Sequence, residues 1–79
     1  MSLASDIRKA EAEGRTQARK VTQLSSKASR ETLSERVGAW AAELKTARMS
    51  AAMGEDLSRV VSAAFSHELA KIMLKHNHG

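Results

Sequence analysis

The sequence predicts an all-α fold, and three observations support this. Proline is absent, and glycine occurs only four times in 79 residues. Alanine, leucine, glutamate, lysine, arginine and glutamine dominate, and these residues lose little side-chain freedom on entering a helix. Apolar residues recur at steps of three and four, and no stretch alternates apolar and polar residues as a half-buried strand does. We therefore expect one helical domain over 1–79 and no strand.

The first expected element is a helix over about 4–28, within a basic amino-terminal region of residues 1–30. Large apolar residues (Leu, Ile, Val, Met, Phe and Trp, without Met1) number four in 1–32 and fourteen in 33–74. Small side chains offset little of the backbone entropy lost on folding, so this helix is expected to be marginally stable alone. Its apolar stripe consists of Leu3, Ile7, Ala10, Gly14, Gln17, Val21, Leu24 and Ala28.

The second expected helix spans about 32–53. It begins with the capping-box sequence TLSE, in which the Thr32 hydroxyl can accept a hydrogen bond from the Glu35 amide. Gly38 lies inside this helix and costs about 1 kcal/mol relative to alanine, which a close neighbouring helix would make tolerable. The stripe facing the core consists of Leu33, Val37, Trp40, Leu44, Ala47 and Ala51.

The third expected helix spans about 55–76. Gly54 can adopt the left-handed conformation that ends the preceding helix, and Glu55 and Asp56 then place negative charge at the positive amino end of the next. The two helices form an antiparallel hairpin, 32–76, followed by a flexible tail, 77–79. Equal rise along both helices places Trp40 beside Leu69, Leu44 beside Phe65, Met49 beside Val60 and Val61, and Met53 beside Leu57.

The apolar face of the third helix is broad enough for two neighbours. In a lone hairpin, the second helix provides one of these neighbours and covers part of the face. A second copy of the chain is expected to cover the rest. We therefore predict an oligomeric helical bundle, with a dimer favoured and a tetramer as the alternative. The residues predicted to form the core or the interface are Leu33, Val37, Trp40, Leu44, Leu57, Val61, Phe65, Leu69 and Ile72.

A basic segment without any acidic residue runs from Gly14 to Arg30. Residues 1–48 carry ten basic and six acidic side chains, whereas 49–79 carry three of each, so all the excess positive charge lies in the first part. Such a segment suits the phosphates of a nucleic acid, an acidic protein surface or anionic lipid headgroups, and it equally suits a solvated helix face. The candidate polyanion-binding residues are Arg15, Arg19, Lys20, Lys27 and Arg30.

The stretch TARMSAAMGEDLSRVVSAAF, from Thr46, resembles the helix-turn-helix core of DNA-binding domains. The resemblance implies that the helix after Gly54 would read bases in the major groove. However, Glu55 and Asp56 would carry negative charge toward the phosphates, and Arg59 is the one base-reading donor there. We therefore expect an ordinary turn between two packed helices.

The sequence offers no constellation typical of catalysis or metal binding. Cysteine is absent, which excludes disulfides, thiolate zinc sites and thiol nucleophiles. His76 and His78 point to different sides of a helix. His67 lies between Ser66 and Glu68, which diverge from it on a helix, so no nucleophile–base pair is indicated. We expect no enzyme activity, no cofactor and no metal.

The start, MSLASDIRK, lacks the apolar core of a signal peptide, and no apolar run approaches the ~18 residues of a membrane span. We therefore expect a cytoplasmic protein without a membrane span. The predicted function is that of a small helical interaction module, an adaptor or regulator that acts through protein–protein association and self-assembly. The alternative is a small nucleic-acid-binding regulator that uses the basic segment 15–30.

Overall fold

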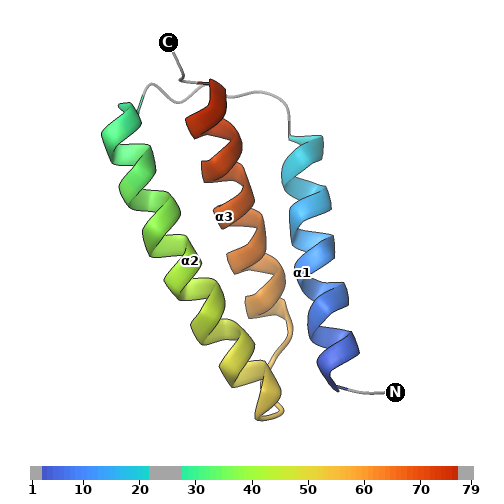
Figure 1. Cartoon of the computed structure of the whole chain (residues 1–79). Helices are drawn as coiled ribbons and strands as arrows, with labels where there is room; N and C mark the ends of the chain where they lie inside the picture. Colours follow the sequence, from blue (N-terminus) through green and yellow to red (C-terminus); the bar gives the residue numbers. More distant parts are fainter. Residues whose placement is uncertain (1–2, 22–27, 77–79) are drawn as a thin grey trace.

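The computed structural model describes residues 3–21 and 28–76, and every regular element in these ranges is a helix. Helix α1 spans Leu3–Lys20, α2 spans Arg30–Ala52 and α3 spans Ser58–His76 (Figure 1). The all-α prediction is therefore confirmed. Leu24, Lys27 and the predicted tail 77–79 lie outside the described residues.

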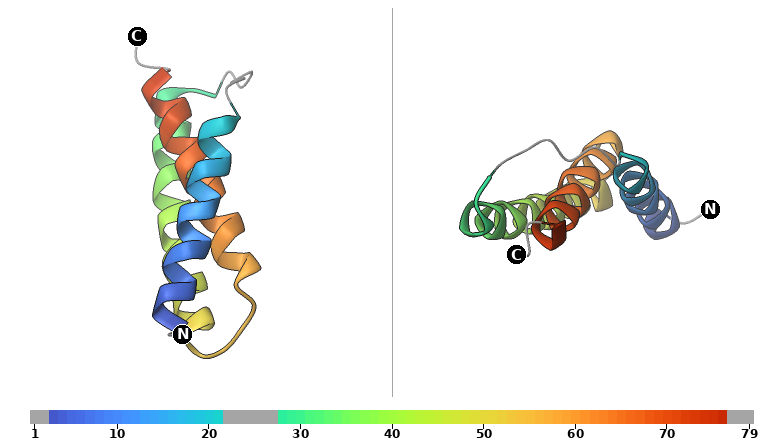
Figure 2. Two further views of the ribbon diagram at one scale, coloured as in Figure 1. Left: turned by 90° about the vertical axis from the view of Figure 1, so that its right-hand side faces the viewer. Right: turned by 90° about the horizontal axis from the view of Figure 1, so that it is seen from above.

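Helix α3 lies between α1 and α2 and packs against both of them (Figures 1 and 2). Helix α1 runs parallel to α3, and α2 runs antiparallel to it. Helices α1 and α2 touch each other far less than either touches α3. The molecule measures 44 × 22 × 14 Å, so it is a layer about one helix thick. Because no second layer covers α3, it has neighbours on two sides only.

Helix α2 begins at Arg30, two residues before the predicted start. Ser29 is the amino-terminal cap, and its Oγ accepts a hydrogen bond from the Thr32 amide (3.1 Å). The capping box predicted at Thr32 and Glu35 is therefore wrong. Ser29 offers the same hydroxyl chemistry three residues earlier, and the cap at that position lengthens the helix by most of a turn.

Gly54 ends α2 as predicted, with a φ of 91°. The Gly54 amide donates to the Ala51 carbonyl (3.0 Å) and the Glu55 amide donates to the Ser50 carbonyl (3.1 Å). These two bonds form a Schellman motif, which satisfies carbonyls that have no partner within the helix. The motif closes the hairpin between α2 and α3.

Helix α3 begins at Ser58 rather than at residue 55. Asp56 lies outside the helix and caps it, because its Oδ1 accepts a hydrogen bond from the Ser58 amide (2.9 Å) and its Oδ2 from the Ser58 hydroxyl (2.7 Å). These hydrogen bonds stabilise the carboxylate and lower the pKa of Asp56. The prediction placed Asp56 in the first turn and missed its capping role.

Helix α1 packs closely against α3 through very small residues. Ala10, Gly14 and Ala18 are its buried residues, and a methyl group built on Gly14 would lie 2.3 Å from the Val61 carbonyl oxygen. Gln17, which the predicted stripe included, is exposed, and Ala18 takes its place. The helix also ends at Lys20 rather than near residue 28.

The buried core is built mainly from alanine, and Leu33 and Val60 are its largest fully buried side chains. Alanines let helix backbones approach closely but bury little apolar area per residue, so each larger side chain contributes a large share of the stability. The buried apolar residues are Ala10, Ala18, Leu33, Leu44, Ala47, Ala51, Val60, Ala63, Ala64 and Ala70.

Among the nine residues predicted as core or interface, Leu33 and Leu44 are buried. The thin layer explains why the rest are only half-buried, since a side chain between two helices stays open to the uncovered faces. The half-buried residues are Val37, Trp40, Leu57, Val61, Phe65, Leu69 and Ile72.

Two details of the predicted hairpin are wrong. Met49 and Met53 are 62% and 84% exposed, so they do not pack on α3. Met49 follows Leu44 by five residues, which is about 140° around the helix and away from the buried stripe. Gly38 is exposed and a methyl group built on it would meet no atom within 4 Å, so no described helix comes close to it.

Within the described residues, no helix combines the length and the apolar character needed to cross a lipid bilayer.

Candidate functional site

One side of α3 carries large apolar side chains that the described helices cover only in part. Phe65, Leu69 and Met73 recur every four residues, so they form a single stripe along α3. All three are half-buried, as is Trp40, which faces this stripe from α2. We call Trp40, Phe65, Leu69 and Met73 the open face. It contains both aromatic residues of the chain.

Two hollows lie along the open face. The first, of about 490 Å³, lies along the groove between α1 and α3 and is lined by Glu13, Gln17, Ser58, Val61, Ser62 and Phe65. The second, of about 150 Å³, separates α2 from α3 and is lined by Leu33, Arg36, Trp40, Ser66, Leu69, Ala70 and Met73. The open face is therefore ridged along α3 and hollowed on either side, a shape that can interlock with another helical layer.

Charged side chains border the open face on both sides. Glu13 lies on α1 and accepts a hydrogen bond from Gln17 (3.3 Å), and Lys20 lies two turns further along the same helix. Arg36 lies on α2, one turn before Trp40. Within the described part of the chain, Glu13, Lys20 and Arg36 form no ion pair. Their charges remain available to a partner.

The basic residues predicted to bind polyanions do not all lie together. Arg15 pairs with Glu11 (3.3 Å), and Glu11 also accepts hydrogen bonds from Arg48 of α2, one of them at 3.1 Å. Arg15 thus belongs to a network that ties α1 to α2. Lys27 lies outside the described residues.

Arg19, Lys20 and Arg30 lie at the same end of the layer, because α1 ends and α2 begins there, on opposite sides of α3 (Figure 1). Helix α3 ends there as well and adds Lys71 and Lys75. We call Arg19, Lys20, Arg30, Lys71 and Lys75 the basic end. It draws its charge from three helices rather than from the single segment 15–30.

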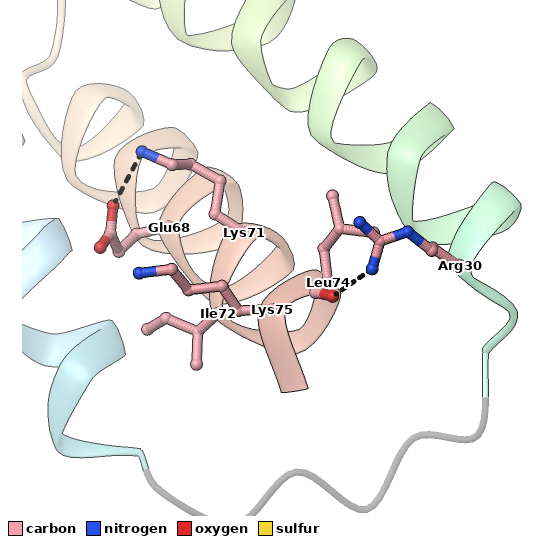
Figure 3. A pocket seen from close by; sticks show the side chains of 6 residues that line it. All are labelled: Arg30, Glu68, Lys71, Ile72, Leu74 and Lys75. Atoms are coloured by element: carbon pink, nitrogen blue, oxygen red, sulfur yellow. Dashed lines mark hydrogen bonds and ion pairs between the residues drawn. The ribbon is translucent and has the colours of Figure 1, made fainter. Parts of the chain in front are cut away.

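A cavity of about 570 Å³ opens at the basic end, lined by Arg30, Glu68, Lys71, Ile72, Leu74 and Lys75 (Figure 3). An Arg30 Nη1 hydrogen donates to the Leu74 carbonyl (3.5 Å), and Lys71 pairs with Glu68 (3.7 Å). The Glu68 carboxylate also accepts a hydrogen bond from Arg19 Nε (3.4 Å). This carboxylate therefore orients cations from α1 and α3 at the mouth of the cavity.

Lys71 and Lys75 belong to the basic end but were not among the polyanion-binding residues predicted from the sequence. Cations at a helix carboxyl terminus are favoured by the helix dipole, which explains these lysines without any ligand. The signal that could have identified them is the order of the helices. In a three-helix layer whose neighbours along the chain are antiparallel, the end of the third helix meets the end of the first and the start of the second.

The helix-turn-helix resemblance finds no support in the geometry. Helices α2 and α3 run antiparallel side by side (Figure 1), whereas a helix-turn-helix crosses its helices at about 90–120°. Arg59 pairs with Glu43 (3.6 Å) and with Glu55 (4.0 Å). Its guanidinium is therefore bound within the hairpin, as expected for an ordinary turn between packed helices.

His67 lies on α3 and is half-buried. Partial burial is the main cause that lowers the pKa of His67 below its ordinary value of 6.5, and the positive charges of Lys71 and Arg48 add to the effect. Glu68 and Glu11 oppose the shift. The folded state therefore favours the neutral imidazole.

Acidification is expected to destabilise the fold through His67. The unfolded chain binds the proton more tightly than the folded chain, so stability falls as the pH drops below about 6.5 and towards the lower folded pKa. Thermal unfolding at about pH 7.5 and about pH 5.5 measures the loss, and His67→Gln should reduce it. His76→Gln, at an exposed position on the same helix, should leave the loss unchanged. An equal loss in wild type and His67→Gln would contradict the assignment.

The described residues contain no group of three or more His, Asp or Glu side chains that could hold a metal ion. Comparison with protein-family models, curated protein sequences and solved structures found no match to this chain. The open face and the basic end are therefore the features on which a functional proposal must rest.

Proposed function

We propose that this chain is a non-enzymatic helical interaction module that acts by self-association through the open face. The observation that carries the proposal is the half-buried stripe of Phe65, Leu69 and Met73, with Trp40 beside it, on a layer one helix thick. A helix layer needs a second layer to bury its apolar side. Tryptophan and phenylalanine on such a side are typical of interface centres.

The charges along α1 favour a second copy as the partner. Glu13 and Lys20 are two turns apart and share one side of the helix. The hydrogen bond between Arg19 and Glu68 joins residues 49 positions apart and sets the level of α1 against α3. Because α1 and α3 run parallel, each residue of α1 is level with the residue of α3 that is 49 positions later in the chain. The midpoint between Glu13 and Lys20 is therefore level with Phe65.

A second pair of residues, Arg36 and Trp40 on α2, also has its midpoint at the level of Phe65. Arg30 reaches the Leu74 carbonyl, and α2 runs antiparallel to α3. The midpoint between Arg36 and Trp40 lies eight residues after Arg30, so it is level with the residue about eight positions before Leu74, next to Phe65. Both pairs are therefore centred on one line across the open face.

A twofold axis along this line packs two open faces together with their helices antiparallel. Glu13 of one copy then faces Lys20 of the second copy, and Arg36 of one copy faces the Trp40 ring of the second, a cation–π arrangement. The antiparallel arrangement also places the two basic ends at opposite ends of the dimer, which avoids repulsion between them.

Charge reversal tests this dimer. Glu13→Lys opposes two lysines across the axis, and Lys20→Glu opposes two glutamates, so each single variant should dimerise about tenfold more weakly, a loss of about 1.4 kcal/mol. The double variant restores both pairs and should recover the wild-type affinity. An equimolar mixture of the two single variants should form heterodimers. Sedimentation equilibrium over a range of micromolar concentrations gives the affinities.

The single tryptophan provides a second readout, because burial of Trp40 at the interface should shift its fluorescence to shorter wavelength as the protein concentration rises. Glu35→Lys is the matched control, since Glu35 is exposed on α2 at about 200° around the helix from buried Leu33. It should dimerise as wild type does. A monomer at all concentrations would refute self-association, and equal weakening by Glu35→Lys would refute the Glu13–Lys20 pairing.

A further inference from the structure

We infer that the basic end is a binding site for the phosphodiester backbone of a nucleic-acid duplex. The inference does not require the proposed self-association, because the cavity at the basic end is lined by residues that share no member with the open face. Lys20 is the one residue of the basic end that also takes part in the proposed dimer contacts. It rests on the cations that all three helices contribute to one end of the layer. The cations are Arg19, Lys20, Arg30, Lys71 and Lys75.

Positive charge at this end exceeds what the neighbouring carboxylates neutralise. Glu68 is the one carboxylate that lines the cavity, its side chain is 12% exposed, and it is shared between Arg19 and Lys71. Lys20 and Lys75 form no ion pair with the described residues.

Two further carboxylates lie near the start of α2, on Glu31 and Glu35, and both residues are exposed. Glu31 lies about 100° around the helix from Arg30 and Glu35 about 140° from it. They therefore point away from the side of α2 on which Arg30 reaches α3. The opposite end of the layer differs, because Arg48 and Arg59 there are held by Glu11 and Glu43.

The kind of anion follows from what surrounds the charges. Cations spread over three helix ends match a row of phosphates better than a single phosphate, since each lysine or arginine can neutralise a separate group along a backbone. Trp40 and Phe65 both lie on the open face, so the only ring that the described basic end offers to an unpaired base is the small imidazole of His76. A duplex, which offers phosphates without exposed bases, is therefore favoured over a single strand.

An anionic membrane is a poorer match. Surface binding to lipid combines positive charge with apolar side chains that enter the headgroup layer. At this end, Ile72 and Leu74 are half-buried in the wall of the cavity, and Val21 is the one large apolar residue among those described here that is substantially exposed, at 41%.

The test uses the full chain and a fluorescein-labelled, mixed-sequence DNA duplex of about 20 base pairs, titrated at about 50, 100 and 200 mM NaCl. Neutralisation of three to five phosphates predicts a slope of about −3 to −5 for log K against log salt. The triple variant Arg30→Gln, Lys71→Gln, Lys75→Gln should bind at least tenfold more weakly at the lowest salt, with a slope smaller in magnitude by about 3.

The matched control is Arg8→Gln, Lys9→Gln, Lys45→Gln. These residues are exposed, lie towards the other end of the layer and form no ion pair with the described residues. Both triple variants remove the same charge from a net charge of +4, so the control should keep the wild-type slope. Circular dichroism and sedimentation show whether each variant keeps its helices and its association state.

Three results would overturn the inference. One is no duplex binding by wild type at about 50 mM salt, where phosphate contacts are strong. Another is equal weakening by both triple variants, which would show that net charge alone attracts the duplex. The third is binding to anionic phosphatidylserine vesicles, or to single-stranded DNA of the same length, that exceeds duplex binding at the same salt concentration.

Discussion

Replacement of Gly14 by alanine is expected to destabilise the protein by about 3 kcal/mol, although alanine is the better helix former. The added methyl group would lie 2.3 Å from the Val61 carbonyl oxygen and 2.9 Å from both the Ala64 Cβ and the Phe65 amide nitrogen. Two of these obstacles are backbone atoms of α3, which cannot swing aside as a side chain can. Overpacking by a single group typically costs about 1–3 kcal/mol, and a clash with backbone belongs at the upper end.

The loss should appear first in α1, because this helix packs mainly on α3. Hydrogen exchange should show faster exchange for the amides of α1 than for those of the hairpin, and urea unfolding followed by circular dichroism gives the free energy. The protein concentration must be held fixed, because association and folding are linked.

Gly38→Ala is the matched control, since it makes the same change in a helix where no neighbouring atom lies within 4 Å. It should stabilise the protein by about 0.5–1 kcal/mol, the ordinary gain for glycine to alanine in a helix. The two substitutions should therefore have opposite signs. If Gly14→Ala stabilised the protein as Gly38→Ala does, α1 could not lie as close to α3 as described.

Leu44→Ala is expected to lower the free energy of unfolding by about 2–5 kcal/mol. Leu44 is 4% exposed and packs in the main core cluster with Val60 of α3 and Ala10 of α1. The neighbouring side chains are mostly alanines, which have no rotamers with which to fill the cavity left behind. In a domain of this size, the loss corresponds to a fall of roughly 10–30 °C in Tm.

Met49→Ala removes a comparable apolar side chain from the same helix at a position that is 62% exposed. Its free energy of unfolding should change by less than about 0.5 kcal/mol, as for most surface substitutions. Thermal unfolding of both variants at one protein concentration makes the comparison. Similar losses from Leu44→Ala and Met49→Ala would contradict the burial pattern of α2.

The two proposed surfaces can operate in one molecule. The open face runs along the length of α3, whereas the basic end lies at the end of the layer where α1 and α3 end and α2 begins. An antiparallel dimer through the open face would present two basic ends at opposite ends of the assembly. Glu13→Lys alters only the dimer contacts, and the triple variant of Arg30, Lys71 and Lys75 alters only the basic end, so these two variants separate the activities. Lys20→Glu alters both surfaces and should weaken both.

Local chemistry in the sequence determined most of the helical fold. The absence of proline and the steps of three and four predicted three helices, and Gly54 marked the end of α2 because a left-handed residue there completes a Schellman motif. In the predicted stripe of α2, Leu33, Leu44, Ala47 and Ala51 are buried and Val37 and Trp40 are half-buried. Residues at such spacing share one side of a helix whatever that helix packs against. Cap positions were less certain, because Ser29 and Thr32 offer the same hydroxyl.

The tertiary structure alone decided how the helices share α3. The sequence suggested a hairpin core with a weakly attached first helix, because large apolar residues are scarce before residue 33. A count of large apolar residues does not register close packing through small residues. Gly14 and Ala18 are buried, and Gly14 lets the backbones of α1 and α3 approach closely.

The candidate sites depend on the same arrangement. The sequence predicted the basic character of Arg19, Lys20 and Arg30, but Lys71 and Lys75 join the same basic end only because α3 ends at the end of the layer where α1 ends and α2 begins. Arg15, equally basic, is held by Glu11. Helical periodicity fixes which residues share one side of one helix, whereas contacts between helices depend on crossing, level and close approach, which no local pattern encodes.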